Sequence, residues 1–322
     1  MDFFKVYLIK DDDKYDISHF VQNVEWSGRR GSAARKLKVV LLDDPNRSRT
    51  KIIVQRGHRC IFRYNDVEYF RGIITDQKQS NKKMMTFTAH DMGIFLSNNA
   101  DSFEYREYTA GMIFKDCCER FELPYEAIAD TEYKIPELIE SKMTAWDVIT
   151  DALRITWEST GARFYVFSDH DKLSLVDRRM NLVQVVLEQG SNIESWDLDR
   201  SIMDTRTRLK LISSEGQTVA QASDPELENR FQGIFQDVED VDEGLNEAQL
   251  HEKVNAMLEE RKYVEQTLSL TAFGHPDVIA GRAAMVKIPD VSISSTMFIE
   301  EDIHEFSSNN YMMDLKLSYK ME

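Results

Sequence analysis

Short segments of alternating apolar and polar residues, each followed by a turn signal, constrain the fold of this chain most strongly. The clearest lies near the end, where Met313, Leu315, Leu317 and Tyr319 alternate with Met312, Asp314, Lys316 and Ser318. Because side chains along a strand point alternately to its two faces, we expect the first four to face a core. Similar segments recur along most of the chain and indicate a protein built mostly from antiparallel strands.

The first third of the chain consists of such segments and contains little that favours a helix. Turn signals at 11–14, 43–46 and Asn65-Asp66 separate them, and the last of these is typical of a two-residue hairpin. Six or more short strands joined in this way predict a small antiparallel β-barrel over residues 1–98.

The pattern changes to a helical period after residue 98. Ile113, Cys117 and Phe121 recur at intervals of four, which predicts a helix over 109–122. A second helix is expected from Thr144, a capping residue, to Gly161, which suits the position after a helix. A hairpin around 168–171 follows. These signals predict an α+β domain over residues 99–190.

Strands resume in the last third, around a strongly acidic stretch. Residues 215–247 contain ten Asp or Glu and one basic residue, which predicts an exposed loop that is mobile unless a partner orders it. A helix is expected near Asn246, and three strands complete a second barrel over residues 191–322. The predicted fold is therefore α+β and mostly β, with two small antiparallel barrels flanking the α+β domain.

The charge is unevenly distributed. The chain has a net charge of −16, yet residues 1–99 hold 18 Lys and Arg against 12 Asp and Glu. A cluster of basic residues in and around a Gly-Ser-Ala loop is a candidate partner-binding site: Arg29, Arg30, Arg35, Lys36 and Lys38. It could be a solvated loop or a contact for an acidic protein surface. Binding of nucleic acid is less favoured, because no aromatic residue is interleaved for base stacking.

Known catalytic and cofactor motifs are missing from the sequence, including phosphate-binding, dinucleotide-binding, zinc-protease and CxxC motifs. The pairs His90-Asp91 and His170-Asp171 resemble fragments of acid–base dyads, but neighbours on an extended chain face opposite ways. The run at 11–13 lacks the Gly and the distal Glu of a calcium loop. We therefore expect no enzyme, no catalytic residue, no metal and no cofactor.

The cysteines and the apolar runs bear on where the chain folds. Cys60, Cys117 and Cys118 are an odd number in a long chain, so buried reduced thiols are expected rather than disulfides. No apolar run approaches 18 residues, and the amino terminus does not resemble a secretory signal. We expect synthesis and folding in a cytoplasm.

Three stretches, taken in order, resemble a known family. They are WSGRRGSAARKLKVVLLDD, then IPELIESKMTAWDVITDAL with GARFYVFSDHDKLSLVDRR, and finally the run from GIFQDVEDVDEGLNEAQLHEKVNAML through SLTAFGHPDVIAGRAAMVKIPD to DIHEFSSNNYMMDLKLSY. The chain resembles the XkdQ/YqbQ family of baseplate hub proteins of contractile phage tails and phage-tail-like bacteriocins. The resemblance covers nearly the whole chain and depends on the order of the stretches.

The resemblance implies a structural role in a phage particle or a phage-tail-like particle. Such hubs carry two related barrels per chain, form homotrimers with pseudo-six-fold symmetry around an axial channel, and join the tail tube to the central spike. The implied neighbours are the tube, the spike, the tape-measure protein and a LysM-type baseplate protein. No small-molecule substrate and no sequence-specific nucleic-acid binding are expected. The alternatives are a cell-wall-degrading hydrolase of a phage tail cluster and, less favoured, a carbohydrate-binding module.

Overall fold

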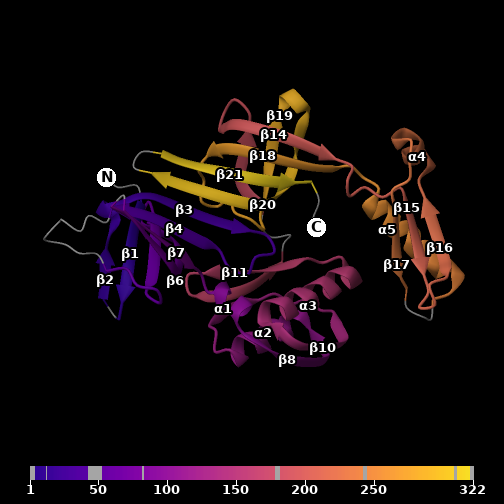
Figure 1. Ribbon diagram of the computed structural model, residues 1–322, viewed down its shortest axis with the longest axis horizontal. Helices are drawn as coiled ribbons and strands as arrows, with labels where there is room; N and C mark the ends of the chain where they lie inside the picture. The colour runs from indigo at the N-terminus through magenta and orange to yellow at the C-terminus, as the bar shows by residue number, and fades with distance from the viewer. Residues whose placement is uncertain are drawn as a thin grey trace. The chain divides into compact units, whose positions relative to one another are not determined.

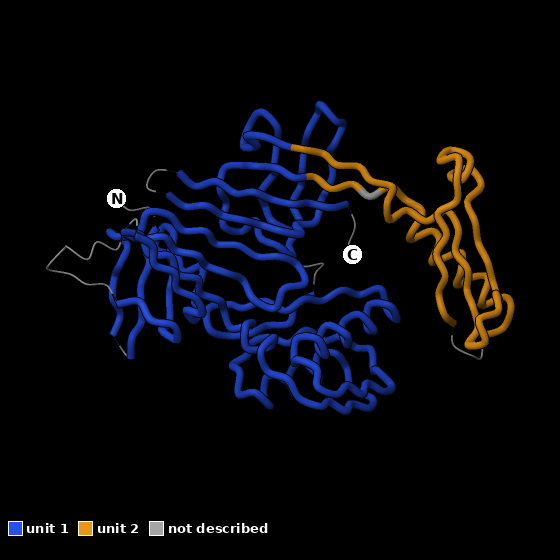
Figure 2. The backbone as a smooth tube through the Cα atoms, viewed as in Figure 1, with its two compact units in different colours: residues 1–196, 269–322 blue, residues 197–268 orange. Residues whose placement is uncertain are grey.

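The computed structural model describes residues 4–11, 13–42, 53–81, 83–177, 182–241, 245–307 and 310–319. The chain divides into two compact units, which Figure 2 colours separately: Met1–Trp196 with Ser269–Glu322, and Asp197–Leu268. The turn predicted at 43–46 lies outside the described residues. The domain boundaries expected at residues 98 and 190 stay a prediction.

One large sheet dominates the described structure (Figure 1). Its thirteen strands are β1 (Phe4–Lys10), β2 (Asp13–Asp16), β3 (Val21–Arg29), β4 (Lys36–Leu42), β5 (Arg59–Tyr64), β6 (Val67–Ser80), β7 (Met84–His90), β13 (Leu182–Glu188), β14 (Ile193–Ser201), β18 (Glu265–Phe273), β19 (Ala283–Ile288), β20 (Ile293–Ser307) and β21 (Asn310–Ser318). They follow the order β14-β18-β21-β20-β3-β4-β7-β6-β5-β1-β2, and β20 also pairs with β19, which pairs with β13.

The longest strand, β20, joins the amino-terminal and carboxy-terminal strands into this one sheet. Its first half pairs with β19, and residues 301–307 pair with residues 23–29 of β3. At about 3.3 Å per residue, a strand of this length spans about 50 Å and is long enough to pair with two groups of strands. The mostly antiparallel β fold is confirmed. The two closed barrels are not seen, because the described strands form an open sheet.

The core under the amino-terminal strands includes a residue from the far end of the chain. Phe306 of β20 lies with its ring centroid 4.8 Å from that of Phe62 on β5 and 4.0 Å from that of Tyr311 on β21. Phe306 and Phe62 are buried. This contact ties the two ends of the chain together by apolar burial as well as by strand pairing.

The predicted helices of the middle region are confirmed. The region contains α1 (Gly93–Asn98), β8 (Ala100–Thr109), α2 (Ala110–Arg120), β9 (Tyr125–Ile128), β10 (Lys134–Thr144), α3 (Ala145–Thr160), β11 (Phe164–Asp169) and β12 (Lys172–Asp177). The Thr144 hydroxyl accepts a hydrogen bond from Asp147 N at 3.1 Å, and Gly161 adopts a φ of +71°. The start and end signals read from the sequence therefore act as caps of α3.

The acidic region folds instead of forming a loop, so that prediction is wrong. The unit Asp197–Leu268 contains β15 (Arg208–Ile212), β16 (Thr218–Ser223), α4 (Pro225–Phe231), β17 (Gln236–Asp240) and α5 (Glu247–Arg261). Arginines from distant positions pair with its carboxylates: Arg208 with Glu228, and Arg261 with Asp237 and Glu239. These acidic side chains are therefore paired with arginines of the same unit, which the composition of the acidic stretch alone does not reveal. Residues 242–244 lie outside the described residues.

The alternation expected in the last strand is confirmed for three of its four residues. Met313, Leu315 and Leu317 are buried on one face of β21. Tyr319 lies beyond the end of the strand and is 39% exposed, so its predicted core position is wrong. The predicted hairpin at Asn65-Asp66 is also confirmed, since both residues have positive φ between β5 and β6. None of the described helices is long and apolar enough to span a bilayer.

Candidate interaction surface

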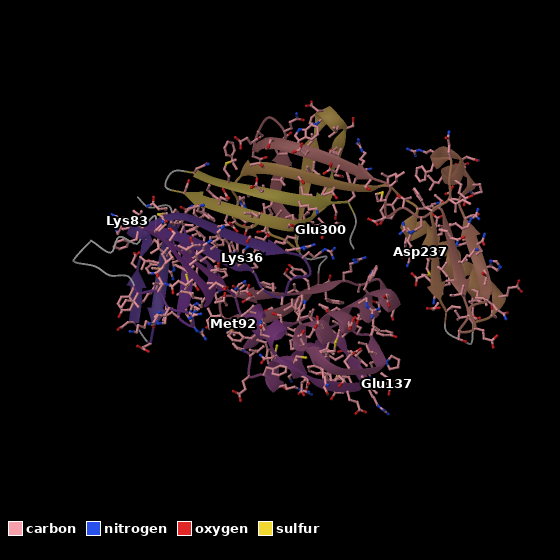
Figure 3. All side chains as sticks on the ribbon, in the orientation of Figure 1. Lys36, Lys83, Met92, Glu137, Asp237 and Glu300 are labelled. Atoms are coloured by element: carbon pink, nitrogen blue, oxygen red, sulfur yellow. The ribbon has the colours of Figure 1, made fainter. Side chains whose placement is uncertain are left out.

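The predicted partner-binding residues lie around the connection between β3 and β4, and we call residues 29–38 the basic loop. In Figure 3, Lys36 marks the start of β4 and Glu300 lies on β20. The sheet register places Glu301 opposite Arg29 and Asp302 opposite Gly28. The acidic run at 300–302 therefore lies beside the basic loop, although about 270 residues separate them in the sequence.

Arg35 and Asp302 form the most buried ion pair of this surface. Arg35 Nη1 donates to Asp302 Oδ1 at 2.8 Å and Nη2 donates to Oδ2 at 2.5 Å. The Asp302 side chain is fully buried, and Ala280 N donates to it as well. Burial alone would raise the pKa of Asp302, but the charge and hydrogen bonds of Arg35 lower it to about 2. The pair is a desolvated, bidentate clamp between the basic loop and β20.

The side chains of His304, Tyr311 and Trp26 contact this ion pair or one another. His304 is fully buried, and its Nε2 lies 3.0 Å from the carbonyl oxygen of Val278 and 3.3 Å from Asp302. His304 Nδ1 lies 2.8 Å from the Tyr311 hydroxyl. The Arg35 guanidinium lies over the Trp26 ring at 4.3 Å. A cation, a carboxylate and an imidazole are thus held in one buried network.

Glycines allow the close approach of the basic loop to its neighbours. A Cβ at Gly28 would overlap the Arg35 guanidinium, and a Cβ at Gly93 would overlap the backbone of Ala33. Asp91 holds the end of the loop, because it accepts hydrogen bonds from Arg35 N at 3.1 Å and Gly93 N at 3.0 Å. Burial raises the pKa of Asp91 to about 7, against the effect of these donors.

The other four predicted residues pair with carboxylates of the same chain but stay more exposed. Arg29 lies 3.2 Å from Glu301, and Arg30 pairs with Glu300. Lys38 lies 2.8 Å from Glu25, which also lies 3.6 Å from Lys36. The Arg29 side chain is 70% exposed, and those of Lys36 and Lys38 are each 44% exposed. Contact of these residues with a partner stays a prediction.

A cleft of about 520 Å³ opens beside the basic loop within the larger unit. Residues 29–35, strand β11, part of α3 and the segment 276–282 line it. Seven arginines and four carboxylates belong to the lining, and six of the arginines pair with carboxylates of the same chain. Its lining also contains the aromatic residues Trp26, Tyr69, Phe70, Trp146, Trp157, Phe164, Tyr165 and Phe167. The cleft can therefore offer guanidinium and apolar contacts together.

The His-Asp pairs considered in the sequence are separate features of the structure. His90 Nδ1 lies 2.9 Å from the Thr75 hydroxyl, whereas Asp91 is occupied by backbone donors. His170 lies in a hairpin and pairs with Asp169 at 2.6 Å instead of with Asp171. Within the described ranges, no group of three or more His, Cys, Asp or Glu side chains is placed to hold a metal.

The three cysteines are free and buried, as expected. Burial raises the pKa of Cys117 and Cys118 to about 12 and raises that of Cys60 as well. The neutral thiols are therefore part of the cores of the molecule.

Comparison with known proteins gives a consistent result along the whole chain. A family model described as YqbQ-like matches residues 24–318. The uncharacterized protein YqbQ of Bacillus subtilis strain 168 is 30% identical over 321 residues, which cover 98% of this chain and 97% of that protein. The phage-like element PBSX protein XkdQ of the same organism is 28% identical over 320 residues, with the same coverage.

Among solved structures, the 43 kDa tail protein of prophage MuSo2 from Shewanella oneidensis has a closely similar fold. The TM-score is 0.75, and the match covers 98% of this chain and 97% of that chain at 11% sequence identity. At this level of identity the likeness establishes the fold alone, which is that of a phage tail protein.

Proposed function

Because this chain belongs to the YqbQ-like family, we propose that it is a structural baseplate hub subunit that joins a tail tube to a central spike. The observation that carries this proposal is the match over 98% of the chain to the fold of a prophage tail protein. The name of the relative XkdQ, from a phage-like element, supports the same role. The resulting particle is a phage tail or a phage-tail-like bacteriocin, and the subunit is synthesised in the bacterial cytoplasm.

The subunit acts as a homotrimer with pseudo-six-fold symmetry around an axial channel. Two groups of strands, which meet where β3 pairs with β20, support the presence of two barrel-type domains in each chain. Three chains then present six such domains to a six-fold tube. The domains are residues 1–98, the α+β insert 99–190, and residues 191–322.

The proposed partners are the tail tube protein, the spike, the tape-measure protein and a LysM-type baseplate protein. Neither a small-molecule substrate nor sequence-specific nucleic-acid binding forms part of this proposal. A catalytic role is not part of it either, and release of fragments from peptidoglycan by the purified protein would contradict this point.

The exposed part of the basic loop contacts an acidic partner in the assembled particle. Glutamate at Arg29, Lys36 and Lys38 should reduce the yield of assembled particles most strongly at low salt, where like charges repel over the longest range. Arg35 is left unchanged, because its ion pair is needed for the fold. Particle yield is measured by electron microscopy across salt concentrations.

The matched control replaces Arg106, an exposed arginine of β8 that pairs with Glu104 and Glu137, by glutamate. This control should assemble like the unmodified protein. Normal yield of the triple variant at every salt concentration would rule out the contact.

A further inference from the structure

Strand β11 has an unpaired edge in the described structure. It belongs to a three-stranded sheet in the order β11-β12-β9, so β12 covers one of its edges and no described strand pairs with the other. Proteins usually cover such edges or place charges and prolines on them, because a free edge can pair with another chain. Four successive residues of β11, Phe164 to Phe167, are instead aromatic or aliphatic.

The hairpin geometry indicates which backbone groups face the open edge. Asp169 pairs with Lys172 across the two-residue turn, and the closing pair of such a hairpin exchanges both of its backbone hydrogen bonds. Bonded and non-bonded pairs then alternate along the strand. The N–H and C=O groups of Phe164, Val166 and Ser168 therefore point toward the open edge.

This edge lies in the cleft beside the basic loop. Every residue of β11 from Phe164 to Asp169 lines the cleft, as expected when an edge, and not one face, borders a space. Figure 1 shows β11 on the side of the helical region that is turned toward β3. The volume of about 520 Å³ is within the usual range for ligand sites.

Three buried polar atoms in the lining also have no hydrogen-bond partner among the described residues. They are Nε1 of Trp26, Nε of Arg35 and Oγ of Ser168. Buried polar atoms nearly always have a partner, and either a bound water or a docked segment would supply one here.

We propose that the cleft receives an extended, acidic segment of a partner protein, which adds to β11 as a further strand. Backbone pairing with β11 would supply affinity, and alternate side chains would supply specificity. Arg29 and Arg282 provide donors for carboxylates, because a guanidinium has five N–H groups and can bond more than one acceptor. Trp146, Leu153 and Trp157 of α3 provide an apolar wall for the side chains between them.

The inference rests on the proposed hub function and deepens it, because it assigns a partner contact to the open edge of β11 beside the basic loop. The binding itself needs no assembled particle. Failure to bind the probes below would overturn the docking site and leave the hub role to be judged by the place of the subunit in the particle.

The test uses the full chain and fluorescein-labelled peptides of alternating Glu and Val, about seven residues long, which can span the three outward residues of β11. Fluorescence anisotropy should show saturable binding. The matching Lys-Val peptide should bind at least about tenfold more weakly, because of the arginines in the cleft. Methylation of alternate backbone nitrogens blocks one edge of the peptide, so one of the two methylated sets should lose binding.

Protein variants provide an independent check. Arg29→Glu and Arg282→Glu should each weaken binding of the acidic peptide by about tenfold, while the control Arg106→Glu, outside the cleft, should leave it unchanged. Absence of saturable binding, equal binding of the Lys-Val peptide, or full binding of both methylated sets would each overturn the proposal. If the protein self-associates and the acidic peptide disperses the oligomer, the occupant is a second copy, and the assignment to a different protein is wrong.

Discussion

Arg35→Met should lower the free energy of unfolding by about 3–5 kcal/mol at pH 7, because it leaves the Asp302 carboxylate buried without its counter-charge. The Asp302 side chain is fully buried, and both of its oxygens accept hydrogen bonds from Arg35. The measurement is chemical denaturation followed by tryptophan fluorescence. The double variant Arg35→Met/Asp302→Asn should recover part of the loss, since the uncompensated charge is then absent.

The pH dependence of this pair has a definite sign. The pKa of Asp302 in the folded protein, about 2, lies below the ordinary value of 3.8. Its contribution to stability is therefore present above pH 3.8 and is lost as the pH falls toward 2. The deficit of Arg35→Met relative to the unmodified protein should shrink in that window. An Arg35→Met protein as stable at pH 7 as the exposed-site control Arg106→Met would contradict the clamp.

Leu315→Asp should destabilise the protein by about 4 kcal/mol or more, because it removes a buried apolar side chain and introduces a carboxylate. Leu315 is 3% exposed and lies directly opposite Asp302 in the pairing of β20 with β21. The new carboxylate would therefore face a buried charge of the same sign. Thermal or urea denaturation measures the loss.

The neighbouring substitution Lys316→Asp is the matched control. Lys316 is exposed on the other face of β21, opposite Glu301, so the change should cost about 1 kcal/mol or less. Equal melting temperatures for the two variants would mean that the strand register is different.

Local signals in the sequence predicted the elements well where capping or alternation is strong. The helix that begins after Thr144 and the buried residues of β21 both follow from patterns within about ten residues. The family resemblance, which depends on three stretches in order, is confirmed by the family model over residues 24–318. The caps of α3 and the alternation of β21 are decided within a segment, so the sequence contains the whole signal for them.

The buried network around Arg35 was missed because it depends on pairing between distant segments. Asp302 and His304 take inward positions of β20, while Ile303 between them is 39% exposed. Polar residues here take the strand positions that usually face the core, and the apolar residue between them faces outward. This inverted alternation was the signal that the sequence contained. The partner, Arg35, follows only from the register of β20 with β3. The cleft was equally hidden, since its lining comes from β3 and the basic loop, β6, α3, β11 and the segment 276–282.

The prediction for the acidic region was wrong for a related reason. Its composition favours disorder, but β15 and β17 pair in parallel, and Arg261 of α5 bonds to Asp237 and Glu239. The net charge of a segment counts its carboxylates but not the arginines elsewhere in the chain that pair with them. It therefore underestimates order where residues of other elements supply those arginines.

Electron cryomicroscopy of the intact particle, with this subunit located by its fitted fold, tests the proposed hub role most directly. We expect three copies around the axis, between the end of the tail tube and the spike. We also expect the basic loop to face a neighbouring subunit. Location of the subunit at the periphery of the baseplate, or its absence from assembled particles, would contradict the hub assignment.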